Sequence, residues 1–479
     1  MVFDDLRSFL DECEKCEDLE KVEGADWNLE IGTISEMAAE KFGPALLFDK
    51  IKGYPPGYRV ATDLYTTKER IAMAFDMPRE TPKLDIIRQL RTAANEFKPV
   101  KPVEVKSGPV MENVKMGDEV DLLAFPTPIY HEHDGGRYMG TGHIAITRDP
   151  DTGYINAGVE RVMIHDKNTL SFYISPGKHN RIIRQKYWDK GESCPVVMAF
   201  APDPILYLAG ALHVPWGTSE FEWAGWVRKR PVEVIKGKVT GIPFPAHDEI
   251  VIEGEYLPPS KEQREEGPFG EWTGYYAGGR QLEPVVKVKA LYYRNNPILA
   301  GVPPLKPPLH NFAVPIISTP FVWNDLERTG IGGIKGVWQL EGGGGRLITV
   351  ISLKQEHIGH AKQAGLVAAG GHGGGYMGRF VIVVDEDIDP TDVNDVLWAV
   401  ATRSDPATSI DIIRDCWGTR LDPMVGPEKR EKKDYSHSVA IINACKPYVW
   451  MNEFPRTNKA SAELRERVIK KFKGKVRSL

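Results

Sequence analysis

The sequence has few cysteines, no long apolar run and little net charge. Five cysteines are scattered among 479 residues, an odd number that argues against a disulfide framework and favours a reducing cytoplasm. No stretch reaches the roughly 18 apolar residues of a membrane-spanning helix, and the acidic, amphipathic opening MVFDDLRSFLDECEKCEDLEK is not expected to be a signal peptide. A formal net charge of −5 excludes nucleic acid and anionic membranes as the main partners.

What is present is typical of a globular protein with several domains. Hydrophobic residues make up 42% of the chain and charged residues 27%, which indicates neither disorder nor a fibrous class. A chain of 479 residues exceeds one hydrophobic core, and its length predicts about two to four domains. Several domains are therefore expected, and the order of apolar segments along the chain, described next, makes the expected fold class multi-domain α/β.

The pattern of apolar residues changes along the chain and divides it into four parts. Residues 1–118 alternate short apolar runs with helical stretches, which predicts an N-terminal α/β domain. Residues 119–310 are rich in short strands such as HIAITRD and CPVVMAFA, which predicts an antiparallel barrel or sandwich. Residues 311–455 return to α/β alternation, with a parallel sheet expected. Residues 456–479 form an amphipathic helix that packs either on another subunit or on its own chain.

Two helix boundaries have a local explanation. An amphipathic helix is expected to open the chain, because helical spacing is followed by Leu6, Phe9, Leu10 and Cys13. The pair Cys13 and Cys16 is interpreted as one turn of this helix rather than as a metal or redox site. Asp389 before Pro390 predicts an N-cap and first helical residue for a helix through Ala401.

One loop could carry acid–base chemistry. Gly267, Pro268 and Gly270 force an irregular backbone between Glu266 and Glu271, so the two carboxylates can point to one place. Paired carboxylates can divide acid and base roles between them. The alternative is a solvated loop whose glutamates face water.

A second group could hold a metal ion. Asn156, His179 and Glu220 offer two oxygens and a nitrogen, which suits Mn2+ or Mg2+. Taken singly, His179 is also typical of a surface histidine and Asn156 of a turn residue. Asn156 and Arg161 have opposite parity in a regular strand, so a shared site requires a bulge, for which Gly158 is the expected place.

Other polar or glycine-rich segments are weaker candidates. The segment His131-Glu132-His133-Asp134 specifies no third ligand and is interpreted as a polar loop. The glycine runs at 342–345 and 370–375 match neither the P-loop nor the GxGxxG pattern, so a nucleotide-triphosphate enzyme is not supported.

Taken together, these segments resemble the UbiD-like family of prenylated-FMN-dependent (de)carboxylases over nearly the whole chain. The resemblance is carried by YINAGVERVMIHDKNTLSFYISPGKH, GALHVPWGTSEFEWAG, EGPFGEWTGYYAGG, HIGHAKQAG and FVIVVDEDIDPTDVNDVLWAVATR. It implies an N-terminal α/β domain, a central split β-barrel that binds the flavin, and a C-terminal α/β domain.

The resemblance also implies residue roles. Asn156, His179 and Glu220 are expected to hold Mn2+ (or Mg2+) against the flavin phosphate, and K+ is expected at the backbone of Gly210–Leu212. Arg161, Glu266 and Glu271 match the catalytic triad of the family, with a covalent substrate–cofactor adduct and Glu271 as proton donor. The expected cofactor-binding residues are Asn156, Gly158, Val159, Glu160, Arg161, Lys178, His179, Gly210, Ala211, Leu212 and Glu220. A lysine that some relatives use on the phosphate has no counterpart within 372–375.

The expected reaction is reversible, non-oxidative decarboxylation of an aromatic, heteroaromatic or α,β-unsaturated carboxylic acid, with release of CO2. By position, the substrate pocket is expected to include Leu305, Lys306, His310, Met377 and Trp417. A flavin prenyltransferase would supply the cofactor, and a homodimer or higher homo-oligomer is expected. Two alternatives remain open: a subunit, catalytic or scaffold, of a multi-subunit aromatic carboxylase, and a metal hydrolase that needs no flavin.

Overall fold

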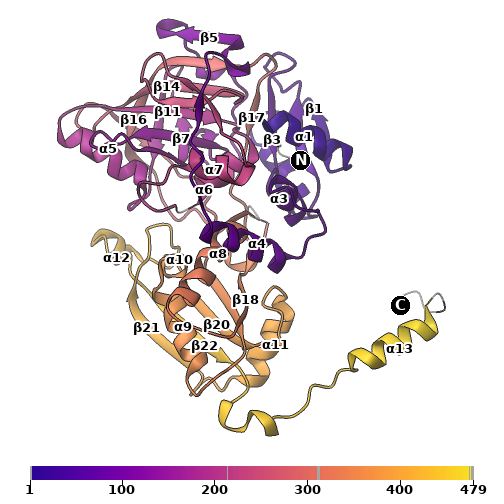
Figure 1. Cartoon of the computed structure of the whole chain (residues 1–479). Coiled ribbons are helices and arrows are strands. Elements are labelled where there is room, and N and C mark those ends of the chain that lie inside the picture. The colour runs from indigo at the N-terminus through magenta and orange to yellow at the C-terminus, as the bar shows by residue number, and fades with distance from the viewer. Residues whose placement is uncertain (1–2, 213, 310–312, 474, 476–479) are drawn as a thin grey trace.

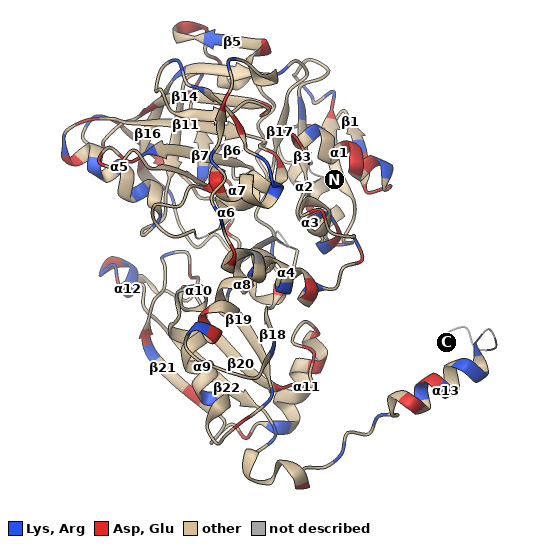
Figure 2. Cartoon of the chain, viewed as in Figure 1, with Lys and Arg blue, Asp and Glu red and all other residues tan. Residues whose placement is uncertain are grey.

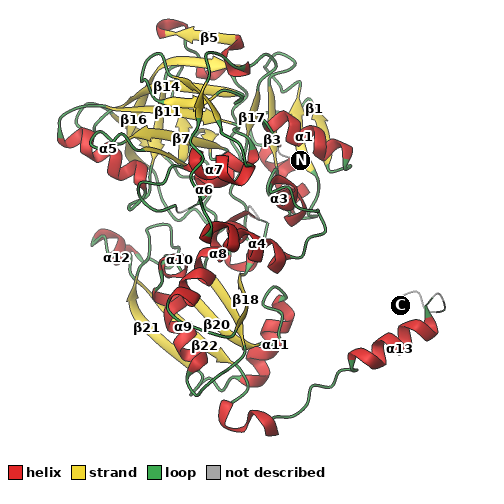
Figure 3. Cartoon of the chain, viewed as in Figure 1, coloured by secondary structure: helices red, strands yellow, loops and turns green. Residues whose placement is uncertain are grey.

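The computed structural model describes residues 3–212, 214–309, 313–473 and 475. Figure 1 shows an N-terminal α/β part beside a strand-rich central part, with a second α/β part below them. The colouring of Figure 3 makes the same division visible, since strands dominate only the central part. The predicted multi-domain α/β class is confirmed.

The N-terminal part is a four-stranded sheet with helices. Its strand order is β1-β2-β3-β17, and β17 comes from beyond the central sheet in sequence. Its elements are α1 Leu6–Lys15, β1 Leu19–Glu23, α2 Glu30–Ala39, β2 Ala45–Asp49, β3 Arg59–Thr62, α3 Lys68–Ala74 and β17 Ile298–Ala300. As predicted, α1 buries Leu6, Phe9, Leu10 and Cys13. All five cysteines are free.

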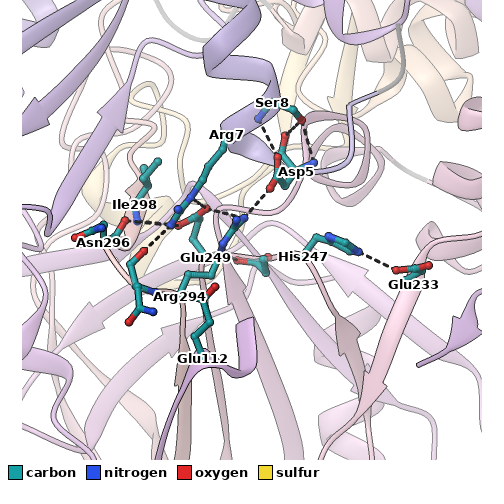
Figure 4. A network of polar contacts seen from close by, with 12 residues as sticks. Asp5, Arg7, Ser8, Glu112, Glu233, His247, Glu249, Arg294, Asn296 and Ile298 are labelled. Carbon is teal, nitrogen blue, oxygen red and sulfur yellow. Dashed lines mark hydrogen bonds and ion pairs between the residues drawn. The ribbon is translucent and has the colours of Figure 1, made fainter. Parts of the chain in front are cut away.

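A charged network fastens α1 to the central sheet (Figure 4). The Arg7 guanidinium donates to both carboxylate oxygens of the buried Glu249, at 2.7 and 2.8 Å. Arg294 Nη1 lies 3.2 Å from Glu249 Oε1 and 2.6 Å from Oδ2 of Asp5, the residue that caps α1. The Glu249 carboxylate is fully buried and pairs with two arginines. Removal of either arginine would therefore leave its negative charge less compensated.

The central part is built on a ten-stranded sheet. Its main path runs β6-β9-β10-β16-β14-β11-β7-β8, and β5 and β15 pair with β16. Its strands are β5 Asn113–Met116, β6 Arg137–Gly140, β7 His143–Arg148, β8 Ile155–Gly158, β9 Arg161–Ile164, β10 Thr169–Tyr173, β11 Cys194–Phe200, β14 Ile250–Tyr256, β15 Gln263–Glu266 and β16 Gln281–Tyr293. The helices that accompany it are α5 His179–Asp189, α6 Pro204–Ala211 and α7 Glu220–Arg228.

This sheet must curl, because β8 and β9 lie near opposite ends of the strand order. Only Val159 and Glu160 separate the end of β8 from the start of β9. Three successive Cα–Cα steps span about 11 Å at most, so the two ends of the sheet approach each other. The expected split barrel is therefore formed by a curled antiparallel sheet.

The predicted bulge at Gly158 is wrong. Asn156 and Arg161 do not lie in one bulged strand, because β8 ends at Gly158 and a separate strand, β9, starts at Arg161. Asn156 and Arg161 need not share strand parity, because they belong to strands with different neighbours: β8 pairs with β7, and β9 pairs with β6 and β10.

The remaining elements are a small sheet and short 3-10 turns. The small sheet has the order β13-β12-β4, with β4 Val103–Glu104, β12 Glu233–Lys236 and β13 Pro243–Pro245. Three turns precede β6 in the chain: η1 Pro109–Glu112, η2 Gly117–Glu119 and η3 Leu122–Ala124. The other two, η4 Glu341–Gly343 and η5 Tyr448–Glu453, belong to the C-terminal part.

The C-terminal part is a five-stranded sheet of order β18-β19-β20-β22-β21, in which β19, β20 and β22 are parallel. Its elements are α8 Ala313–Arg328, β18 Ile334–Gln339, β19 Ile348–Leu353, α9 His360–Gly370, α10 His372–Gly375, β20 Phe380–Asp385, α11 Val393–Arg403, β21 Ile410–Cys416, α12 Pro427–Glu431 and β22 His437–Ala444. The predicted cap of α11 is wrong: the Asp392 side chain accepts from Asn394 N at 2.9 Å, whereas Asp389 caps only the preceding turn at Thr391.

Helix α4 (Lys83–Asn95) precedes the central part in sequence but packs on α8 of the C-terminal part. The Arg91 guanidinium lies 4.6 Å from the centre of the Trp323 ring and bonds Asn324 at 3.3 Å. The N-terminal region of the chain therefore contributes to both of the α/β parts.

The last helix, α13 Ala462–Phe472, has no buried residue. Figure 1 shows it at the end of an extended segment that leads away from the C-terminal part, and the colouring of Figure 2 shows that its residues include both charge signs. Leu464 and Ile469 are 38% and 43% exposed. None of the described helices is long and apolar enough to cross a membrane.

Candidate active site

A cavity of about 340 Å³ lies between the central and C-terminal parts. The central part contributes β8, the start of β9, the ends of α5, α6 and α7, and the loop around Glu271. The C-terminal part contributes α8, the end of β18, the segment after η4, and residues near Tyr376 and Trp417. Its volume falls in the range of small-molecule sites.

Arg161 lies between two carboxylates at this cavity. Its Nη2 donates to Glu266 Oε2 at 2.6 Å, and its Nη1 donates to Glu271 Oε1 at 2.7 Å. All three side chains are buried. With both acids ionised the cluster would carry one uncompensated negative charge, which is costly away from water. Burial therefore raises the pKa of Glu271 to about 7, helped by the nearby Glu266 charge and opposed by Arg161.

Local backbone structure explains how the two carboxylates meet one guanidinium. Glu266 ends β15, which pairs with β16, and the chain then turns at Gly267, whose φ of +86° suits glycine. Glu271 N donates back to Tyr275 O at 3.0 Å, which closes the far side of the loop. The interpretation of this segment as a solvated loop is therefore wrong for Glu266 and Glu271.

The polar segment 131–134 supports this loop. The buried Asp134 side chain accepts from His131 N at 3.0 Å and from Gly270 N at 3.3 Å. Gly135 N donates to Pro268 O at 2.7 Å. A Cβ at Gly135 would lie 2.0 Å from Gly267 O, so only glycine fits there. The segment thus holds the acidic loop in place.

Sequence reasoning missed Tyr138. Its hydroxyl donates to Glu266 Oε1 at 3.0 Å, and its ring centre lies 4.1 Å from that of Phe269. It is fully buried. The two bonded residues are 128 positions apart in the chain, and no spacing rule links them.

The candidate metal ligands lie on the same cavity. Asn156 Oδ1 is 3.2 Å from His179 Nδ1, and Glu220 Oε2 accepts from Ala157 N at 2.7 Å. His179 and Glu220 are the first residues of α5 and α7. Burial raises the pKa of Glu220 to about 8. Tyr154, which the sequence did not single out, places its hydroxyl 3.2 Å from Asn156 Oδ1 and 3.4 Å from His179 Nδ1.

The other predicted cofactor contacts also line this cavity. Val159 N donates to Gly210 O at 3.1 Å, and the Lys178 ammonium donates to Val159 O at 3.3 Å and lies 3.9 Å from Glu160. The cavity wall includes Gly158, Val159, Glu160, Lys178, Gly210, Ala211 and Leu212.

Of the predicted substrate-pocket residues that the structure describes, Trp417 lies on the cavity wall and the others do not. Trp417 lines the cavity, but Leu305 faces a separate small pocket beside Asp63. Lys306 is exposed, and Met377 is buried away from the cavity wall. His310 lies outside the described residues. Wall residues that the sequence did not indicate include Ser318, Gln339, Arg346 and Tyr376.

Family models match three consecutive stretches of the chain. They are the N-terminal, Rift-related and C-terminal domains of 3-octaprenyl-4-hydroxybenzoate carboxy-lyase (UbiD), at residues 10–90, 101–307 and 313–444 respectively.

Similar proteins agree with these matches. The chain is 33% identical over 428 residues to a pyrrole-2-carboxylic acid decarboxylase of Pseudomonas aeruginosa, covering 84% of this chain and 83% of that protein. It is 32% identical over 442 residues to a phenolic acid decarboxylase of Bacillus subtilis, covering 89% and 90%.

Solved structures of the same class superpose on the fold. The UbiD-class enzyme HmfF from Pelotomaculum thermopropionicum in complex with FMN gives a TM-score of 0.84 at 29% identity, covering 96% of this chain and 98% of that one. The vanillic acid decarboxylase of Sedimentibacter hydroxybenzoicus, in closed form, gives 0.84 at 26% identity, covering 98% and 99%. With matches along most of its length, this chain belongs to the UbiD family of carboxy-lyases.

Proposed function

We propose that the protein is a non-oxidative decarboxylase of an aromatic, heteroaromatic or α,β-unsaturated carboxylic acid, with prenylated FMN as cofactor and Glu271 as proton donor. The observation that carries the proposal is the buried Arg161 between Glu266 and Glu271 at the wall of a large cavity. Burying charged groups away from water costs folding free energy. Buried clusters of this kind are typical of sites that transfer protons.

The residues present fit a flavin phosphate and a divalent cation. Asn156, His179 and Glu220 offer an amide oxygen, an imidazole nitrogen and a carboxylate, a donor set that suits Mn2+ or Mg2+. Glu220 is buried with its pKa raised, so a nearby cation would relieve the cost of its charge. Lys178 would add positive charge for the phosphate, and K+ would bind at the backbone of residues 210–212.

When bound, prenylated FMN supplies an electron sink for the carbon that loses CO2. Arg161 orients the substrate carboxylate, because its guanidinium stays charged and is fixed by two acids. Glu271 is the acid best suited to return a proton, because a pKa of about 7 lets it hold and release one near neutral pH. Arg161 donates to both acids and Tyr138 donates to Glu266, whereas Glu271 is the one of the two acids that lines the cavity, so Glu271 is the acid that can reach a substrate.

The test is co-expression with a flavin prenyltransferase, followed by assay with Mn2+ and K+ against cinnamic, hydroxybenzoic, furoic, pyrrole and indole carboxylic acids. We expect a coloured holoprotein, CO2 release, and in D2O one deuterium on the carbon that lost the carboxylate. A protein that binds the flavin yet releases no CO2 from any acid would favour the scaffold role. Activity that persists after flavin removal would favour the hydrolase.

We also propose that the protein forms a homodimer or higher homo-oligomer through α13. This helix buries none of its own residues, and its apolar positions Leu464 and Ile469 remain exposed. A second copy of the chain would cover them.

A further inference from the structure

The C-terminal wall of the cavity presents one arginine to the site. Three acids line the cavity, Glu160, Glu220 and Glu271, and all of them come from the central part. Among the described lining residues of the C-terminal part, Arg346 is the only charged side chain. Burial lowers the pKa of Arg346, with Tyr376 opposing the shift. Its position indicates a role toward something inside the cavity.

Arg346 is held close to the catalytic loop. Its guanidinium carbon lies 5.9 Å from the ring centre of Trp272, the residue that follows Glu271. Glu271, Trp272 and Arg346 line the same cavity, so one bound molecule can contact both Glu271 and Arg346 if it is long enough.

The glycine run at 342–345, which matches no nucleotide motif, explains this placement. Gly344 and Gly345 have φ of +62° and +70°. A Cβ at Gly344 would lie 2.7 Å from the Trp272 ring, and one at Gly345 would lie 2.6 Å from Pro315. Glycine at both positions lets the segment pass between Trp272 and α8 and turn Arg346 onto the cavity wall.

Polar groups accompany Arg346 on this wall. Ser318 and Gln339 also line the cavity and are hydrogen-bonded to each other. Gln339 N is fixed by Thr319 Oγ1 at 3.3 Å. The C-terminal wall thus offers a guanidinium and side-chain polar groups, whereas a wall for a plain hydrocarbon ring would be apolar.

We propose that the substrate is a dicarboxylic acid whose second carboxylate, on the far side of the ring or chain from the leaving one, is bound by Arg346. This inference rests on the proposed decarboxylase function and extends it to a substrate class. A guanidinium fork matches a carboxylate in two parallel hydrogen bonds, which an uncharged ring substituent cannot reproduce. The proposed phosphate site is formed by the central part, where Asn156, His179 and Glu220 would hold the cation and Lys178 would add positive charge, whereas Arg346 belongs to the C-terminal part.

The binding test uses the holoenzyme and two unreactive saturated acids, cyclohexanecarboxylate and trans-cyclohexane-1,4-dicarboxylate. Isothermal titration should show the diacid binding about 10- to 100-fold more tightly. Arg346→Gln should abolish that preference, Arg346→Lys should keep part of it, and the flavin absorbance of all three proteins should be equal. Arg414→Gln removes the same charge from an exposed site of the C-terminal part and should change nothing.

The second test measures kcat/KM of the holoenzyme for cinnamate and for 4-carboxycinnamate. Arg346→Gln should lower kcat/KM for the diacid by about 10- to 100-fold and leave the monoacid unchanged. Equal binding of mono- and diacid by the wild type, or a preference that survives in Arg346→Gln, would overturn the inference. So would loss of flavin from that variant, since Arg346 would then serve the cofactor. A diacid preference in binding without CO2 release would support the anion site and contradict the decarboxylase.

Discussion

Tyr138→Phe removes one hydroxyl and tests how the acidic cluster shares its proton. In the wild type that hydroxyl donates to Glu266 Oε1 at 3.0 Å inside a fully buried cluster. A hydrogen bond to a charged group contributes about 1.5–3 kcal/mol, and each 1.36 kcal/mol is roughly a tenfold change in an equilibrium. Without it Glu266 keeps Arg161 as its donor, and the equilibrium that leaves the cluster's proton on Glu271 should shift by about 10- to 100-fold.

The assay is kcat for CO2 release by the holoenzyme across pH 5–9, with the flavin spectrum as a check on cofactor binding. We expect kcat to fall by up to about one to two orders of magnitude, with a displaced pH profile. Tyr130→Phe is the matched control: Tyr130 is in the same apolar cluster, but its hydroxyl lies by Gly301. The reasoning is refuted if Tyr138→Phe keeps both the wild-type rate and the wild-type pH profile.

Four further predictions concern the same site and the terminal helix. Glu271→Gln should lower kcat by about 100-fold or more while the flavin stays bound, and near-full turnover would remove Glu271 as proton donor. The wild-type rate should decline above about pH 7, where Glu271 loses its proton; a rate still rising there would contradict this. The folded-state pKa of Glu271 lies above the usual 4.5, so its contribution to stability is present at low pH and is lost as pH rises toward 7. Thermal denaturation of the apoprotein should show this loss, at most ~3 kcal/mol, and Glu271→Gln should flatten it. Deletion of residues 456–479 should reduce the mass seen by light scattering, and an unchanged mass would exclude α13 as the oligomer contact.

A regular local pattern predicted the first helix correctly. The period of Leu6, Phe9, Leu10 and Cys13 predicted α1 because one apolar face of a helix must be buried, and these residues are. The errors came where two local signals competed. Both Asp389 and Asp392 can accept from backbone N–H groups two residues on, and the sequence gives no measure of which one starts the helix.

The site was predictable only in part, and for a physical reason. Acids that flank glycine and proline in one loop are visible in a sequence, so Glu266 and Glu271 could be proposed from spacing. Tyr138 and Arg346 reach the site through tertiary packing, Tyr138 from β6 and Arg346 from the turn after η4. Neither stands in a local pattern that differs from that of an ordinary core tyrosine or surface arginine.

The short link between β8 and β9 gives the site its geometry. Asn156 lies on the last strand of the sheet at one end and Arg161 on the strand next to the other end. Val159 and Glu160 join them. The Val159 backbone N–H donates to Gly210 O, and its carbonyl accepts from the Lys178 ammonium. Because the link is so short, the proposed cation site and the proton-transfer cluster cannot move apart without breaking the curl of the sheet. The short link therefore fixes the residues that would hold the cofactor relative to the proposed proton donor, and such fixed positions favour proton return to a single carbon.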